Sequence, residues 1–164
     1  MCIRDSFGLE RALAGLNVPF ERAAVGDRYV LEMLRERGWT LGGEGSGHIV
    51  CLDLTTTGDA IVAALQVLTA MVQTGRPLRE LKQGMSKLPQ VMVNVSSPDP
   101  SRAAELPSLQ LAVKDKSQLL AGRGRILVRP SGTEPVIRVM VEGEDHTEVS
   151  AIADDLAAAV QQEG

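Results

Sequence analysis

The residues best suited to chemistry form one short segment between two predicted strands, Arg129-Pro130-Ser131-Gly132-Thr133-Glu134-Pro135. Gly132 allows the backbone to turn, and Ser131 and Thr133 present hydroxyl groups. Exposed backbone N–H groups in such a turn form a concave site for an anion. The guanidinium of Arg129 offers a planar fork of donors that suits phosphate. The segment therefore predicts a phosphate-binding turn.

Two further charges bear on this turn. Arg138 lies on the following predicted strand and would add a second positive charge. Glu134 argues against unselective anion binding, because it places a negative charge near the expected phosphate. The alternative interpretation is an ordinary hairpin turn with two solvated arginines, and spacing alone does not decide between the two.

A second polar segment is rich in glycine, Gly43-Glu44-Gly45-Ser46-Gly47-His48. Glu44, Ser46 and His48 alternate, so in an extended segment they would point to one side. A carboxylate, a hydroxyl and an imidazole suit a ligand with several hydroxyl groups, and glycines let it approach the backbone closely. The segment is neither a Walker loop nor a dinucleotide fingerprint, because no Gly-Lys-Ser/Thr follows and a strand comes next. The alternative is a polar hairpin loop.

A third polar patch follows Val25 at an expected strand-to-helix junction. Asp27 is a good helix N-cap, and Asp27 and Arg28 are additional candidate binding residues. A capped helix with surface charge explains both without a ligand. No catalytic nucleophile with its base is apparent, since Ser46 and His48 lack an orienting acid. Nor does the sequence contain an Asp-rich stretch for Mg²⁺, or a partner cluster that would make a lone His a metal ligand.

The composition is that of a globular protein. The chain has 164 residues, of which 44% are hydrophobic and 23% charged, enough for one domain or two small ones. A net charge of −4, with one Trp, one Tyr and two Phe, argues against general nucleic-acid binding. The longest nearly uninterrupted apolar run, residues 60–72 with Gln66 and Thr69 as its only breaks, is too short to span a bilayer, and no signal peptide is apparent. Cys2 and Cys51 make no disulfide framework, so we expect a cytoplasmic protein without a membrane partner.

The first half of the chain reads as an α/β pattern. Hydrophobic spacing predicts helices at residues 9–16, 29–37 and 59–73, and strands at residues 18–24, 39–42 and 49–52. The last helix is apolar almost all round, so we expect it to be buried. Thr56, three residues before Asp59, resembles a capping box. No strand is predicted before the first helix, and Met1 to Ser6 fit neither periodicity, so we expect an N-terminal part to be missing.

The second half reads as a smaller unit. Strands are predicted at residues 91–95, 125–129 and 136–141, helices at residues 108–120 and 147–162, and a polar loop with at most a turn of helix at residues 96–107. This β-α-β-β-α order indicates a two-layer α+β domain. We therefore predict a partial three-layer α/β/α domain over residues 7–75, a linker or hinge over residues 76–88, and a C-terminal domain over residues 89–164.

The two polar loops, in this order and at this separation, resemble the α-D-phosphohexomutase superfamily and, within it, the bacterial phosphoglucosamine mutases. The sugar-specificity loop of those enzymes has the pattern Gly-Glu-x-Ser-Gly-His, which residues 43–48 match. Their phosphate-binding loop has the pattern Arg-x-Ser-Gly-Thr-Glu-Pro, which residues 129–135 match. Residues 25–30, 55–59 and 137–143 are also similar to these enzymes. The resemblance extends from Phe7 to the C-terminus.

This resemblance implies the latter part of the third domain and all of the fourth domain of a four-domain isomerase. The family's phosphoserine loop and its Asp-rich Mg²⁺ loop belong to the first two domains. No serine here is therefore assigned as the phosphoserine, no metal ligand is assigned to this chain, and Mg²⁺ is expected in the complete enzyme. The missing N-terminal domains of the same polypeptide are the implied partner, and the 164 residues alone are expected to be inactive.

In the family, the phosphoserine converts a hexosamine 6-phosphate into a bisphosphate, which turns over and returns its other phosphate. The resulting 1-phosphate is a precursor of UDP-N-acetylglucosamine for cell-wall synthesis. The resemblance assigns the phosphate to Arg129, Ser131, Gly132, Thr133 and Arg138, and the sugar hydroxyls to Glu44, Ser46 and His48. Some relatives carry His where Asp27 stands here, and a negative charge there would suit an amino sugar's ammonium group. Two alternatives stay open: a non-catalytic phosphosugar-binding module, and a phosphoglucomutase or phosphomannomutase of the same superfamily.

Overall fold

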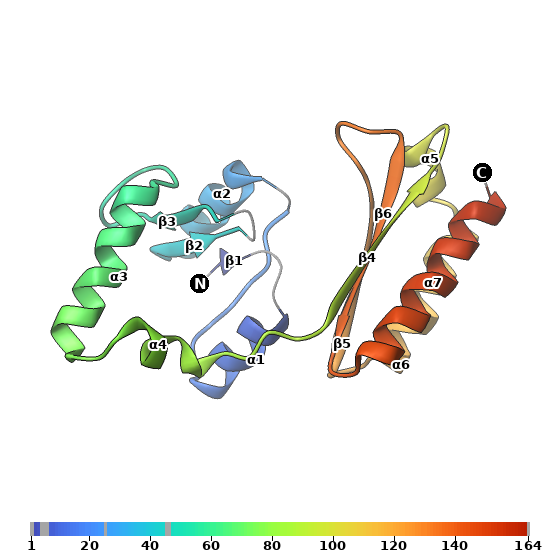
Figure 1. The fold of residues 1–164 in the computed structure, drawn as a ribbon. Helices are drawn as coiled ribbons and strands as arrows, with labels where there is room; N and C mark the ends of the chain where they lie inside the picture. Colours follow the sequence, from blue (N-terminus) through green and yellow to red (C-terminus); the bar gives the residue numbers. More distant parts are fainter. Residues whose placement is uncertain (1, 4–6, 25, 45–46, 164) are drawn as a thin grey trace. The chain divides into compact units, whose positions relative to one another are not determined.

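The chain folds into two compact units, residues 1–87 and residues 88–164. The computed structural model describes residues 2–3, 7–24, 26–44 and 47–163, and each unit is treated by itself (Figure 1). None of the helices in these described ranges combines the length and the apolar character needed to cross a membrane.

Unit 1 contains a small mixed sheet with helices around it. Its strands are β1 (Cys2–Ile3), β2 (Leu41–Gly43) and β3 (Ile49–Cys51), and its helices are α1 (Phe7–Gly15), α2 (Asp27–Arg37), α3 (Ala60–Thr74) and α4 (Leu78–Leu81), followed by the 3₁₀ turn η1 (Lys82–Gly84). The strand order is β1-β2-β3, with β1 parallel and β3 antiparallel to β2. The expectation that no strand precedes the first helix is therefore wrong, because β1 supplies a parallel partner for β2.

The core of unit 1 is formed by α2 against the β2–β3 hairpin. Val30 and Leu34, one helical turn apart, are buried together with Val50 of β3. The helix ends at Gly38, whose left-handed backbone lets its N–H reach the carbonyls of the last turn. This packing fixes the N-terminal end of α2, which carries Asp27, relative to the hairpin.

The strand predicted at residues 18–24 does not form. Only Glu21 takes part in a bridge, and the rest of the segment is irregular. The segment is tied to α1, since the N–H of Val18 donates to the carbonyl of Leu13 at 2.9 Å and Arg22 pairs with Glu10. These contacts with the preceding helix replace pairing with the sheet.

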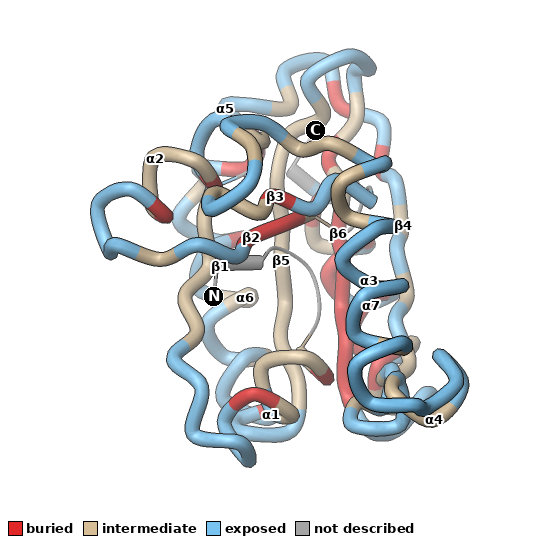
Figure 2. Tube along the Cα trace, turned by 90° about the vertical axis from the view of Figure 1, so that its left-hand side faces the viewer, coloured by how far each residue is buried: buried red, intermediate tan, exposed pale blue. Residues whose placement is uncertain are grey.

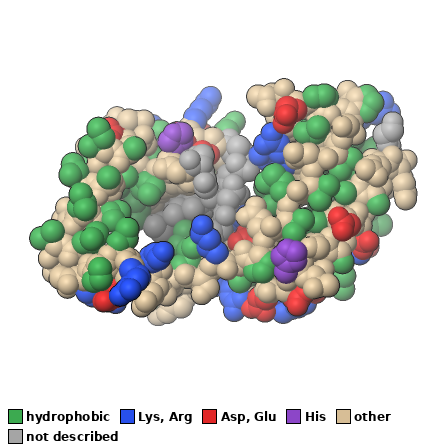
Figure 3. All heavy atoms as spheres, in the orientation of Figure 1, with side chains coloured by type: hydrophobic (Ala, Val, Ile, Leu, Met, Phe, Trp, Pro, Cys, Tyr) green, Lys and Arg blue, Asp and Glu red, His purple; other side chains and the backbone are tan. Residues whose placement is uncertain are grey.

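Helix α3 is correctly placed but it is not buried. None of its residues is buried, and the exposed fraction reaches 73% at Ile61 and 82% at Val72. Figure 2 shows the helix as exposed, and Figure 3 shows hydrophobic side chains gathered over it. A helix that is apolar all round needs partners on every side, and within the described chain it contacts mainly β3 and α4. Its N-cap is Asp59, which accepts hydrogen bonds from the N–H groups of Ile61 and Val62, and the capping box at Thr56 does not form.

Unit 2 is an antiparallel sheet covered on one face by helices. Its elements are β4 (Gln90–Ser96), α5 (Pro100–Ala104), α6 (Pro107–Leu119), β5 (Gly124–Pro130), β6 (Val136–Gly143) and α7 (His146–Glu163). The strand order is β4-β6-β5. α7 packs on β4 and β6, and α6 packs on β5 and α7 (Figure 1). The predicted two-layer arrangement is confirmed, and the short helix α5 occupies the predicted polar loop.

The strand register sorts unit 2 into two faces. Val95, Ile137, Val139 and Val141 point into the helix-covered core, where they meet Leu156 and its neighbours on α7. Side chains alternate along a strand, and directly opposite residues share a face. The other face therefore carries three cross-strand rows, from the 131–135 turn outward: Asn94–Arg138–Arg129, Met92–Met140–Leu127 and Gln90–Glu142–Arg125. We call this the open face.

Candidate functional site

The turn of residues 131–135 links β5 to β6. The Ser131 N–H donates to the carbonyl of Val136 at 2.9 Å, which closes the turn, and the Val136 N–H donates to the carbonyl of Glu134 at 2.8 Å. Gly132 and Thr133 at its tip are exposed. Among the described residues, no heavy atom lies within 4 Å of the point where a Cβ on Gly132 would stand, and its φ is not positive. Neither strain nor crowding within the protein requires glycine here, so a ligand can approach this backbone directly.

The two arginines stand directly opposite each other. Arg129 of β5 pairs in register with Arg138 of β6, so both guanidinium groups share the open face. Like charges in this position destabilise a sheet. Glu134 accepts from Nη2 of Arg138 at 3.0 Å and balances one charge, while Nε of Arg138 is buried with no hydrogen-bond partner in the described chain. Two guanidinium groups on one face suit an anion.

The second polar loop closes the β2–β3 hairpin. The N–H of Glu44 donates to the carbonyl of His48 at 2.8 Å, and the N–H of Gly47 donates to the carbonyl of Glu44 at 3.1 Å. A Cβ on Gly43 would lie 2.8 Å from the carbonyl oxygen of His48, so a side chain there would push the two strands apart. Glu44 and His48 therefore meet because the hairpin closes, not because an extended strand alternates. Gly45 and Ser46 lie outside the described residues.

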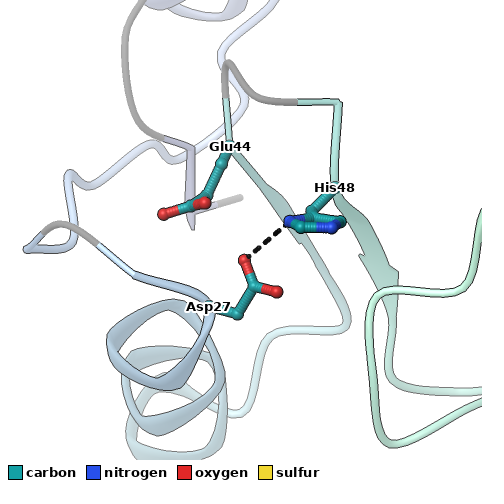
Figure 4. A group of neighbouring side chains, drawn as sticks. All are labelled: Asp27, Glu44 and His48. Carbon is teal, nitrogen blue, oxygen red and sulfur yellow. Dashed lines mark ion pairs between the residues drawn. The ribbon is translucent and has the colours of Figure 1, made fainter.

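Asp27 joins Glu44 and His48. Oδ1 of Asp27 lies 3.2 Å from Nδ1 of His48, and Oε1 of Glu44 accepts from the N–H of Gly26 at 2.8 Å. The three side chains place ligand-type atoms within 4.8 Å of one another (Figure 4). The predicted N-cap role of Asp27 is wrong by one position, since the cap is Gly26 and Asp27 is the first helical residue. The sequence alone did not indicate that Asp27 lies beside Glu44 and His48. Asp27 begins α2, the helix that packs on the β2–β3 hairpin, and that position could have indicated the contact.

Arg28 lies apart from this group. Its Nε donates to Oε1 of Glu32, one turn further along α2, at 2.7 Å, and its side chain is 80% exposed. This hydrogen bond raises the pKa of Arg28 above its ordinary value, so the guanidinium stays charged. The structure places Arg28 in a surface ion pair.

The Asp27–Glu44–His48 group does not fit a resident Mg²⁺ ion. Mg²⁺ prefers six oxygen ligands in near-octahedral geometry, usually several waters with one or two carboxylates. Here an imidazole faces Asp27, and the backbone N–H of Gly26 occupies an oxygen of Glu44. We therefore assign no metal-dependent step to these residues. Hydrogen-bond acceptors held around an imidazole suit a ligand that donates hydrogen bonds.

Comparison with known protein families shows which domains contain the two loops. Residues 3–88 match the model of the phosphoglucomutase/phosphomannomutase alpha/beta/alpha domain III. The chain belongs to this family. Residues 92–159 match the C-terminal domain of the same family, so the hairpin group lies in phosphohexomutase domain III and the opposed arginines in the domain that follows.

The relatives that match this chain are longer than it, and the chain spans about a third of their length. The chain is 55% identical over 159 residues to a phosphoglucosamine mutase of Cellvibrio japonicus, and 57% identical over 156 residues to one of Teredinibacter turnerae. These alignments cover 97% and 95% of this chain but 36% and 35% of the relatives. A structure of Aspergillus fumigatus N-acetylphosphoglucosamine mutase matches 99% of this chain and 38% of its own, with a TM-score of 0.82 at 20% identity. A second structure of that enzyme, in complex with GlcNAc-6P and magnesium, matches with a TM-score of 0.79 over 97% of this chain and 41% of its own. These structural matches support the fold.

Proposed function

We propose that this chain is the substrate-binding C-terminal part of a phosphoglucosamine mutase. Such an isomerase interconverts glucosamine 6-phosphate and glucosamine 1-phosphate through a bisphosphate, with Mg²⁺ and the phosphoserine held by the preceding domains of the same polypeptide. The observation that carries the proposal is the pair of opposed arginines, Arg129 and Arg138, beside the accessible backbone of Gly132. High identity to phosphoglucosamine mutases over nearly the whole chain supports the substrate class.

In this proposal the 129–138 region holds the phosphate that does not react. Arg129 and Arg138 neutralise it, and the hydroxyls of Ser131 and Thr133 with the backbone at Gly132 donate hydrogen bonds to its oxygens. These groups position the substrate and make or break no bond. Because the sugar turns over between the two transfers, the same groups must accept either phosphate. A turn that recognises only the charge and geometry of a phosphate can bind either one.

In this proposal the group of Asp27, Glu44 and His48 in unit 1 binds the sugar. Glu44 accepts hydrogen bonds from ring hydroxyls, and His48 and Ser46 assist. Asp27 is an additional acceptor, with a carboxylate oxygen within 4.8 Å of the ligand-type atoms of Glu44 and His48. Because a carboxylate accepts but cannot donate, this group favours substituents that donate hydrogen bonds. A protonated amino group at the sugar is such a substituent, and it adds a favourable charge.

Three wider expectations follow. The exposed apolar face of α3 would contact polypeptide that the longer relatives have and this chain does not include. The reaction would feed UDP-N-acetylglucosamine and cell-wall precursor synthesis in the cytoplasm. The 164 residues alone would then bind sugar phosphates without converting them.

A chimera tests the proposal. Residues 7–164 would replace the corresponding part of the Cellvibrio japonicus enzyme, and conversion of glucosamine 6-phosphate, glucose 6-phosphate and mannose 6-phosphate would be measured. We expect turnover with the highest kcat/KM for glucosamine 6-phosphate. Preference for glucose or mannose phosphate would assign the chain to the other mutases of the family. A folded chimera that binds sugar phosphates without turnover would favour a non-catalytic binding module.

Asp27→Asn in this chimera tests whether Asp27 recognises the amino group of the sugar. The amide keeps the size of the side chain but removes its charge, so we expect kcat/KM for glucosamine 6-phosphate to fall about tenfold, the cost of one charge-assisted contact. The value for glucose 6-phosphate should stay within about twofold, because that substrate carries no ammonium group. Glu36→Gln, an exposed carboxylate on the same helix, is the matched control and should change neither value. Equal losses for both sugars would contradict the role of Asp27 in selecting the amino sugar.

A further inference from the structure

A third polar side chain stands in the same row as the two arginines. Asn94 of β4 is in register with Arg138 of β6, which is itself in register with Arg129 of β5. Directly opposite side chains on an antiparallel pair are about 5 Å apart at Cβ and share a face. Asn94 is therefore the neighbour of Arg138 on the open face, on the side away from Arg129. The sequence gives no hint of this, because Asn94 lies 35 residues before the phosphate-binding turn.

The chemistry of the open face changes from row to row. The next row away from the turn is apolar, with Met92, Met140 and Leu127, and the row beyond it contains the ion pair of Arg125 with Glu142. The row nearest the turn therefore carries hydrogen-bond donors on all three strands. Asn94 is exposed, and its side-chain amide makes no hydrogen bond within the described ranges of the chain. Nε of Arg138 beside it is also without a partner there.

A phosphate over the central strand would meet donors from three directions. Arg129 flanks Arg138 on one side and Asn94 flanks it on the other, while the backbone of the turn lies at the end of the row. A phosphate monoester presents only acceptors, and a carboxamide supplies two N–H donors without adding charge. A neutral donor suits this position, because Glu134 already balances part of the positive charge.

We propose that Asn94 is a phosphate-binding residue, and that the phosphate site extends from the 131–135 turn across the open face to β4. This inference rests on the proposed function, since it adds a residue to the same site. The ligand it takes is a phosphate monoester, with the Asn94 amide donating to one phosphate oxygen.

The test uses the 164-residue chain labelled with ¹⁵N and titrated with inorganic phosphate and with glucosamine 6-phosphate. We expect the side-chain amide signal of Asn94 to shift with both ligands. Asn94→Ala should weaken binding about threefold to tenfold, as for the loss of one hydrogen bond to an anion. Asn94→Asp should weaken it further, because it replaces the donor by a negative charge. Met92→Ala changes the same face one row away and should leave affinity unchanged, and the backbone spectra would report whether each variant is folded.

The outcomes separate the two proposals. If the wild-type chain binds phosphate, Arg129→Ala weakens binding and Asn94→Ala behaves like Met92→Ala, then the role of Asn94 is wrong and the phosphate-binding turn stands. If neither ligand shifts any signal near the turn at millimolar concentration, the proposed function itself fails. An Asn94 signal that shifts with glucosamine 6-phosphate but not with inorganic phosphate would also contradict the assignment, because it would place the amide on the sugar.

Discussion

Arg129→Ala in the chimera is expected to lower kcat/KM about 100-fold for glucosamine 6-phosphate and for glucosamine 1-phosphate alike, the loss of a bidentate charge-assisted contact. Both substrates should be affected because the same turn holds whichever phosphate is not reacting. Arg138 cannot compensate, since it shares its charge with Glu134. Steady-state kinetics in both directions measures the effect.

Arg102→Ala is the matched control for this substitution. Arg102 is an exposed arginine on α5 in the same unit, outside the row of Arg129 and Arg138, and its loss should leave both values within about twofold. Gly132→Ala adds a second test, because the structure has room for the methyl group. It should preserve the melting temperature and still raise KM, since only a ligand would meet the added atom. Unchanged kinetics in both Arg129→Ala and Gly132→Ala would show that the turn is an ordinary hairpin.

Arg125→Ala is expected to destabilise unit 2 by about 3 kcal/mol, because it removes a guanidinium that pairs with a buried carboxylate. Nε of Arg125 donates to Oε2 of Glu142 at 2.7 Å, and the two side chains are only 15% and 4% exposed. The measurement is urea unfolding of the 164-residue chain, followed by a probe confined to unit 2.

Two further variants serve as controls for Arg125→Ala. Arg123→Ala removes a more exposed pair with Glu148, with side chains 46% and 31% exposed, and should cost less than about 1 kcal/mol. The double variant Arg125→Met with Glu142→Leu should recover most of the lost stability, because an apolar pair has no charge to desolvate. An Arg125→Ala variant no less stable than Arg123→Ala would mean that water reaches Glu142 freely.

The elements of unit 2 could be predicted closely because its strands and helices obey simple periodicities. Residues 136–141 alternate between core and open face, and α7 buries Ile152, Leu156 and Val160 at helical spacing. The row of Arg129, Arg138 and Asn94 could not be predicted in the same way. It depends on the order β4-β6-β5, which places the last strand in the middle, and no local pattern encodes that order.

Unit 1 was harder to predict, for identifiable reasons. The segment of residues 18–24 has strand-like composition, but its bonds to α1 override that preference. The apolar character of α3 correctly gave a helix, but burial depends on partners that the described residues only partly supply. The convergence of Asp27 with Glu44 and His48 needed the hairpin register and the N-terminal end of α2 together, so the sequence showed the residues without their contact.

We proposed that the group of Asp27, Glu44 and His48 binds the sugar and that the 129–138 region binds the phosphate. The most direct measurement is to map backbone amide shifts of the ¹⁵N-labelled chain with three ligands: inorganic phosphate, glucosamine and glucosamine 6-phosphate. We predict that phosphate shifts signals from Arg129 to Arg138 only, and that glucosamine 6-phosphate shifts these together with Asp27, Glu44 and His48, at lower concentration than glucosamine alone. Shifts in unit 2 alone with glucosamine 6-phosphate, or the same affinity for it as for inorganic phosphate, would contradict the claim.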